Sequence, residues 1–294
     1  MNKLKLTMCA SVATLGLAWA GTAAAQTAEP APATPPAAPA APTPSPMPTP
    51  SITAPMAANP YPAVFDAGPL GKITVDGVFS VLGGYQSPSP TFFGGADRNQ
   101  SFFDVSNAQV IINKTDGPIQ FFIQAGAYSL PALGATYFRS TTITPATYGY
   151  VPQGFVKVVP NSMFSIEAGA LPTLIGGEYT FTFQNMNIER GLLWNQEPAI
   201  SRGIQGNLTT GPVAWSLSLN DGLYSNSYDW VTGGATWTID PANTLAFVGG
   251  GNVGHSSTNT VATPFFQNNE DIFNVIYTYN NAPWTITPYF QYTS

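Results

Sequence analysis

The 294-residue chain has few charged residues, and this scarcity narrows the classes of protein to which it can belong. Only 8% of its residues are Asp, Glu, Lys or Arg, whereas an ordinary soluble domain has about 25%. The formal net charge is −6. Nucleic-acid-binding proteins need basic patches to neutralise phosphates, so this charge argues against a nucleic-acid partner.

Long apolar runs are also missing. After the extreme N-terminus no run reaches the ~18 apolar residues of a membrane-spanning helix, so helical spans are excluded. The chain is nevertheless rich in glycine, with 28 residues, and 13% of it is aromatic. This combination is typical of a membrane β-barrel, in which residues that face lipid alternate with residues that face the lumen.

Cysteine is almost absent, since Cys9 is the only one. It lies in residues 1–25, which we predict to be a signal peptide: Lys3 and Lys5 precede an apolar stretch, and small residues at 23–25 form the cleavage site. Cleavage would remove Cys9, which excludes disulfides and thiol chemistry from the mature chain.

Residues 26–70 are dominated by Ala, Pro and Thr, as in Pro35-Pro36-Ala37. Proline fixes φ and removes amide donors, so we expect an extended, solvated linker. A periplasmic spacer is favoured over a binding motif, and the barrel is expected to occupy residues 71–294.

The rest of the chain consists of short runs in which apolar and polar residues alternate at period two, which predicts about eleven β-strands. The runs cover residues 73–85, 102–113, 119–128, 150–159, 164–170, 199–209, 213–220, 230–239, 244–253, 271–279 and 284–292. Tight turns and longer loops join them in strict rotation, as in outer-membrane barrels. The predicted fold is therefore an all-β, antiparallel transmembrane barrel.

The clearest alternation lies in residues 213–220. It assigns one set of side chains to lipid and the other to the lumen. The lipid set is Val213, Trp215, Leu217 and Leu219, and the lumen set is Ala214, Ser216, Ser218 and Asn220.

The longest loop, between about 171 and 199, gathers charges in this charge-poor chain. Its candidates for a pore constriction, taken with the strand that follows, are Glu178, Glu189, Arg190, Glu197 and Arg202. The alternative is that these groups lie on the solvated outer surface as weak ion pairs. Lys157 and Glu167 lie within strands, and we expect both to face the lumen because a charge facing lipid is costly. The excess of Glu predicts a weak preference for cations.

One segment carries a family resemblance. Phe183-Gln184-Asn185-Met186-Asn187-Ile188-Glu189-Arg190-Gly191-Leu192-Leu193-Trp194, followed by Glu197-Pro198 and Arg202-Gly203-Ile204, resembles the central signature of the putative β-barrel porin-2 family. The run Gly77-Val78-Phe79-Ser80-Val81-Leu82-Gly83-Gly84-Tyr85 is similar to that family's first strand. The resemblance extends from about residue 71 to the end. It implies a porin-like barrel in the bacterial outer membrane, with no catalytic residues.

Two hypotheses for the function remain open. The first is a porin-like channel for passive diffusion of small hydrophilic solutes or ions, and the second is a non-conducting structural or adhesive barrel. In both, outer-membrane lipid is a partner. Neither requires a cofactor or a metal, and neither is an enzyme.

Two motifs that suggest other chemistry are discounted. Residues 249–254 match G-x-G-x-x-G, but no helix pattern follows, as a dinucleotide site requires. His255 is the only histidine, which makes a poor metal site, and no serine in a strong context accompanies it as in an outer-membrane phospholipase.

The strand count raises the question of closure. Single-chain bacterial barrels have even strand numbers, so an odd number predicts an incomplete barrel, with a C-terminal part of the sequence missing. Two alternatives remain: a miscount, for example a strand divided or overlooked near residues 130–150, or closure through a homo-oligomer.

Overall fold

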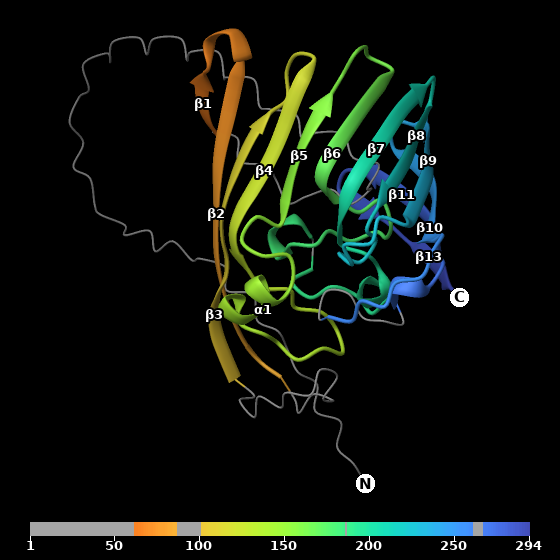
Figure 1. Ribbon diagram of the computed structural model, residues 1–294. Coiled ribbons are helices and arrows are strands. Elements are labelled where there is room, and N and C mark those ends of the chain that lie inside the picture. Colours follow the sequence, from red (N-terminus) through yellow and green to blue (C-terminus); the bar gives the residue numbers. More distant parts are fainter. Residues whose placement is uncertain (1–61, 87–100, 186, 261–266) are drawn as a thin grey trace, which may run out of the picture. The chain divides into compact units, whose positions relative to one another are not determined.

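A computed structural model describes residues 62–86, 101–185, 187–260 and 267–294, all within one compact unit, Pro42–Ser294. The fold is all-β. Thirteen antiparallel strands form one sheet in which neighbours in sequence are neighbours in space (Figure 1). The predicted signal peptide and residues 26–61 of the predicted linker lie outside the described residues.

The strands and helices have the following bounds. The strands are β1 (Ala63–Asp66), β2 (Lys72–Tyr85), β3 (Ser101–Lys114), β4 (Ile119–Tyr128), β5 (Gln153–Val158), β6 (Phe164–Pro172), β7 (Ile200–Thr210), β8 (Val213–Asn220), β9 (Trp230–Asp240), β10 (Asn243–Asn252), β11 (Ile272–Asn281), β12 (Trp284–Ile286) and β13 (Tyr289–Thr293). The helices are α1 (Ser140–Ala146) and the short 3-10 turns η1 (Gly68–Leu70), η2 (Thr182–Gln184), η3 (Leu193–Gln196) and η4 (Gln267–Asn269).

Each predicted alternating run is a strand, and two differences explain the higher count. First, β1 lies within the expected linker, so the sheet begins before residue 71: Ala63 to Asp66 pair with the start of β2. Second, the last predicted strand is divided into β12 and β13, which both pair with β11. Pro288 lies at the division, and proline cannot donate a hydrogen bond to a ladder.

The connection between β4 and β5 contains the helix α1 and no further strand. The miscount therefore does not lie near residues 130–150; it lies in β1 and in the division of the last strand. The segment includes Pro131, Gly134 and Pro145, which interrupt a pattern of period two.

The sheet of the described residues is not closed. Because all neighbouring pairs are antiparallel, β2 and the β12–β13 segment run in the same direction. The edge strand next to β2 is the short β1, which pairs only with Lys72 to Val75, and the β12–β13 segment forms the other edge.

The two faces of the sheet differ as expected for a membrane wall. In β8, Leu217 is 64% exposed on one face, while Ser218 is only 3% exposed on the other. Cross-strand register aligns these sets between strands, so that Ile204 pairs with Leu219 and Gln205 pairs with Ser218. The exposed face carries apolar side chains along most strands, among them Phe79, Phe103, Val110, Ile119, Val156, Ile166, Leu208, Trp237, Phe247, Phe273 and Phe290. This face meets lipid, and the opposite face is lined with amides and hydroxyls.

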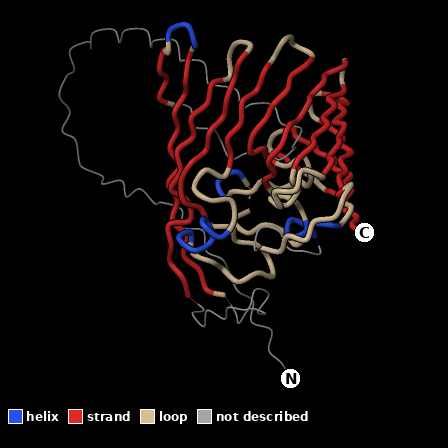
Figure 2. The backbone as a smooth tube through the Cα atoms, viewed as in Figure 1, coloured by secondary structure: helices blue, strands red, loops and turns tan. Residues whose placement is uncertain are grey.

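Turns and loops separate to the two ends of the strands. The short turns lie at one end and the long loops at the other, where several of them lie against the sheet's inner face (Figure 2). In an outer-membrane barrel the short turns are periplasmic. Of the helices in the described ranges, none has the length and apolar character needed to span a membrane.

The assignment of faces in β8 yields a paired prediction. Leu217→Arg would place a guanidinium in lipid, at a cost of about 2–4 kcal/mol near the midplane. We expect it to impair insertion, whereas Ser216→Arg, one residue away on the opposite face, should insert. Protease resistance in membranes measures this difference, and equal behaviour of the two variants would contradict the register.

Candidate functional site: a loop that crosses the inner face

The longest connection in the described sheet joins β6 to β7. We call residues 173–199 the crossing loop, because its hydrogen bonds reach strands on both sides of β6 and β7. Asn107 of β3 donates its side-chain amide to the Thr182 hydroxyl, at 2.5 Å. The Gly176 amide donates to the Asn274 side chain of β11, at 3.1 Å. The loop therefore spans the inner face of the sheet from β3 to β11, as Figure 1 shows for the segment between β6 and β7.

Two apolar clusters attach the crossing loop to the wall. Leu174 and Ile175 pack among buried side chains of β9, β10 and β11, including Trp230. Phe181 packs edge-on against Tyr128 of β4, with ring centroids 5.1 Å apart. Burying each large apolar side chain contributes about 1.5–3 kcal/mol. The burial of apolar side chains, which also stabilises the core of a soluble protein, therefore holds the crossing loop on the inner face of the sheet.

Asn185 fixes the shape of the loop between these clusters. Its side chain accepts a hydrogen bond from the Tyr179 amide, at 2.8 Å, and donates to the carbonyls of Tyr179 and Phe181, at 2.7 and 2.9 Å. One buried amide group therefore satisfies three backbone groups that water would otherwise have to reach.

Glu197, at the end of the loop, is 4% exposed. The Tyr289 hydroxyl of β13 donates to its Oε1, at 3.3 Å, while Oε2 has no hydrogen-bond partner among the described residues. Burial, reinforced by the nearby negative charge of Glu178, raises the pKa of Glu197 to about 8. The carboxyl is therefore mainly protonated at neutral pH. Gly176, in a left-handed conformation with φ +87°, leaves room for it.

Arg190 is fully buried, and burial lowers its pKa to about 10, so the guanidinium remains charged at neutral pH. It lies over the Trp194 ring, 5.1 Å from the centroid. The negative charges of Glu178 and Glu189 raise the pKa of Arg190 and so partly offset the effect of burial. Neither carboxylate forms an ion pair with Arg190 among the described residues. The Glu178 carboxylate instead accepts the Gly191 amide hydrogen, at 2.7 Å, and Glu189 is exposed.

The backbone of Arg190 joins the crossing loop to the β4–β5 connection. Its amide donates to the Pro131 carbonyl, at 3.1 Å, and its carbonyl accepts from Leu133, at 2.9 Å. The loop is therefore braced by a second loop as well as by the wall.

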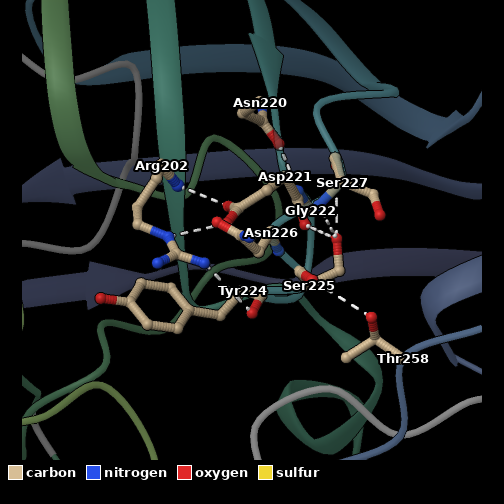
Figure 3. A network of polar contacts seen from close by, with 9 residues as sticks. All are labelled: Arg202, Asn220, Asp221, Gly222, Tyr224, Ser225, Asn226, Ser227 and Thr258. Atoms are coloured by element: carbon tan, nitrogen blue, oxygen red, sulfur yellow. Dashed lines mark hydrogen bonds and ion pairs between the residues drawn. The ribbon is translucent and has the colours of Figure 1, made fainter. Parts of the chain in front are cut away.

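Arg202, the fifth constriction candidate, interacts with the β8–β9 loop and not with the crossing loop. It forms an ion pair with Asp221 through Nε, at 2.8 Å, and its backbone amide donates to the same carboxylate, at 2.6 Å (Figure 3). The Tyr224 ring lies against its guanidinium, with Cζ 3.9 Å from the centroid. Asp221 also accepts from the Asn226 amide, at 3.2 Å. This network ties the β8–β9 loop to β7.

Lys157 and Glu167 occupy adjacent strands on the inner face, and both are buried. Lys157 Nζ lies 3.7 Å from Glu167 Oε2, and Gln205 donates to Glu167 Oε1, at 2.7 Å. Asn207 and Ser216 extend the polar chain along the wall. The pair thus adds no net charge to the inner face.

Several residues of this site have no distinguishing pattern in the sequence. Asp221 is the clearest case. The segment Asn220-Asp221-Gly222 has the composition of a turn, but this composition does not indicate that Asp221 binds Arg202, 19 positions away. Tyr289 and Asn274 resemble ordinary strand residues in sequence, and only the course of the crossing loop shows their role.

Within the described ranges, no group of three or more His, Cys, Asp or Glu side chains could hold a metal ion. Residues 249–251 lie in β10, and the described residues that follow it, 253–260, contain no helix. Most of the G-x-G-x-x-G motif is thus part of a strand.

A two-faced antiparallel sheet with a loop across its inner face is the architecture of a porin-like β-barrel protein. The family model described as "Putative beta-barrel porin-2, OmpL-like" matches residues 72–294, and the chain belongs to this family. No curated protein matches the chain.

Proposed function

We propose that the protein is a channel through which small hydrophilic solutes diffuse passively, and that the crossing loop narrows its lumen. The observation that carries this proposal is the attachment of the loop to the inner face at β3, β4 and β11. A loop held there by buried side chains restricts the cross-section available to solutes, and the groups it carries would bias which solutes pass.

The composition of the inner wall supports passage of hydrophilic solutes. Its buried side chains are mostly amides and hydroxyls, including Asn107, Gln109, Gln124, Gln205, Ser218, Thr232, Asn274 and Thr278. These side chains are covered, and some bond to one another, as Gln124 does to Gln109, so they make the wall polar without adding a row of like charges that would bind ions strongly.

Recording in planar bilayers tests the proposal. The full chain is expected to produce ohmic conductance steps, once protease protection has shown that it is inserted. Inserted protein without steps would overturn the channel assignment and favour the second candidate, a structural or adhesive barrel.

Ion preference tests the position of the crossing loop. We expect a weak preference for cations at pH 7, which strengthens at pH 9 as Glu197 ionises. Glu189→Gln combined with Glu197→Gln should shift the reversal potential in a salt gradient toward anions, more at pH 9 than at pH 7.

Asp240→Asn is the matched control for that experiment. Asp240 is an exposed carboxylate in the turn between β9 and β10, at the end of the strands away from the long loops. Its removal should leave the reversal potential nearly unchanged. Equal shifts in the control and the double variant, or none in either, would place the crossing loop outside the conducting path.

A further inference from the structure

The β4–β5 connection, residues 129–152, shares a buried apolar cluster with the crossing loop. The cluster combines side chains of two strands and both loops: Tyr128 of β4, Tyr148 of the connection, Phe181 and Ala199 of the crossing loop, and Ile200 of β7. Tyr128 and Phe181 are both fully buried. Because one cluster holds side chains from both loops, neither loop can leave its position without exposing apolar surface of the other.

Tyr128 closes the β4–β5 connection at its base. Its hydroxyl accepts a hydrogen bond from the Tyr148 amide, at 3.1 Å, and shares another with the Thr147 hydroxyl, also at 3.1 Å. The buried Thr144 hydroxyl of α1 accepts from the Tyr128 amide, at 2.9 Å, and donates to the Tyr128 carbonyl, at 3.0 Å. One residue therefore joins the beginning of the connection to its end and fixes α1 beside β4.

The first part of the connection holds the crossing loop through its backbone. Beyond the two backbone bonds of Arg190, the Asn195 side chain donates to the Leu133 carbonyl, at 3.0 Å. Hydrogen bonds depend on direction as well as distance, so these contacts fix the place of the crossing loop more closely than apolar packing does. The connection and the crossing loop therefore meet both at these bonds and in the apolar cluster.

We propose that Tyr128 positions the crossing loop by holding the β4–β5 connection in place, so that the two loops form one unit over the inner face. Coupling between separate segments is carried by packed side chains and hydrogen bonds. Tyr128 supplies both, since its ring packs on Phe181 while its hydroxyl holds Thr147 and Tyr148. The consequence for conductance rests on the proposed function, whereas the coupling of the two loops does not.

Spin labels in the full chain test this role of Tyr128. Cys9→Ser removes the only native cysteine. In separate proteins, Ile188→Cys places a label at an exposed position of the crossing loop, and Thr142→Cys places one at an exposed position of α1. Electron paramagnetic resonance of the protein in membranes measures the mobile fraction of each label.

Tyr128→Phe keeps the ring against Phe181 and removes only the hydroxyl. The ratio of mobile to immobile label should rise at least about five-fold at both positions, because losing a buried hydrogen bond shifts a local equilibrium by about that factor. Thr147→Val removes one of the two hydroxyl contacts from the side of the connection. It should move both labels in the same direction by a smaller factor, and it tests the proposal even if Tyr128→Phe fails to fold.

Tyr137→Phe is the matched control. The Tyr137 hydroxyl belongs to the same connection but donates to Asp104 of β3, at 3.0 Å. Its removal should leave the label at residue 188 unchanged. An unchanged label at residue 188 in Tyr128→Phe and Thr147→Val, or an equal response to Tyr137→Phe, would overturn the proposal.

Recording in planar bilayers separates this proposal from the proposed function. In a conducting protein, Tyr128→Phe should add transitions between conductance levels, because the crossing loop is then held less firmly. A chain that inserts without conducting would contradict the proposed function, while the two labels would still decide the role of Tyr128.

Discussion

Replacing Gly203 by alanine is expected to destabilise the protein by at least about 3 kcal/mol, the upper end of the usual cost of overpacking. A Cβ at this position would overlap the Leu219 carbonyl oxygen and lie 2.6 Å from the Asn220 Cα, both in the backbone of β8. A backbone held by ladder hydrogen bonds on both sides cannot move aside as a flexible side chain can. The change in the free energy of unfolding, followed by urea titration of the folded fraction, measures this cost.

Gly206→Ala is the control in the same strand. The nearest heavy atom to a Cβ at Gly206 would be Phe164 Cε2, at 4.0 Å, which is an ordinary van der Waals distance. Stability should therefore change by less than about 1 kcal/mol. If both alanine variants were equally stable, β7 and β8 would have to lie farther apart at Gly203 than the structure shows.

The pH dependence of stability is the second large effect that we expect. Folding raises the pKa of Glu197 from 4.5 to about 8, mainly because the carboxyl is buried. In the unfolded chain it ionises near pH 4.5, whereas in the folded protein it retains its proton until about pH 8. Its contribution to stability is therefore fully present below pH 4.5 and is lost as pH rises to about 8, on the order of 1 kcal/mol per pH unit.

Glu197→Gln isolates this contribution, since glutamine keeps the shape and a hydrogen-bonding oxygen for Tyr289 but cannot ionise. The unmodified chain should lose stability between pH 5 and pH 8, and the variant should lose much less over the same interval. Glu189→Gln, which alters an exposed carboxyl of the same loop, should retain the slope of the unmodified chain. Parallel curves for all three proteins would show that Glu197 is ionised in the folded state at neutral pH.

Glu197 also changes how the charge of the crossing loop should be counted. The sequence alone suggests three Glu against two Arg around this loop. In the structure Glu197 is mainly protonated at neutral pH, and Arg202 is paired with Asp221. The charges that remain are those of Glu178, Glu189 and Arg190, of which only Glu189 is exposed. A weak ion preference at pH 7 follows from this smaller set.

Local pattern determines most of this fold. The strands are recognisable because each buries one face, and period two then marks every second residue along it. Asp116-Gly117 and Gly211-Pro212 mark two of the turns by backbone preference alone, and both turns lie where expected. The two differences, β1 and the division at Pro288, concern segments too short for periodicity to be decisive.

The tertiary structure alone decides what the charged side chains do. Sequence shows that Glu197 and Arg202 lie near one another along the chain, but their environments depend on Tyr289 and Asp221, which come from other strands or from the turn after β8. Burial and partner determine whether a carboxyl holds its proton, and neither can be read from spacing. The course of the crossing loop likewise depends on apolar contacts with β4 and β9–β11, which form only after the sheet has curved around it. Alternation is a property of a single strand, so the sequence by itself determined the strands of the sheet and their two faces. A site needs side chains from several strands, so only the folded chain determined the course of the crossing loop and the partners of its charged groups.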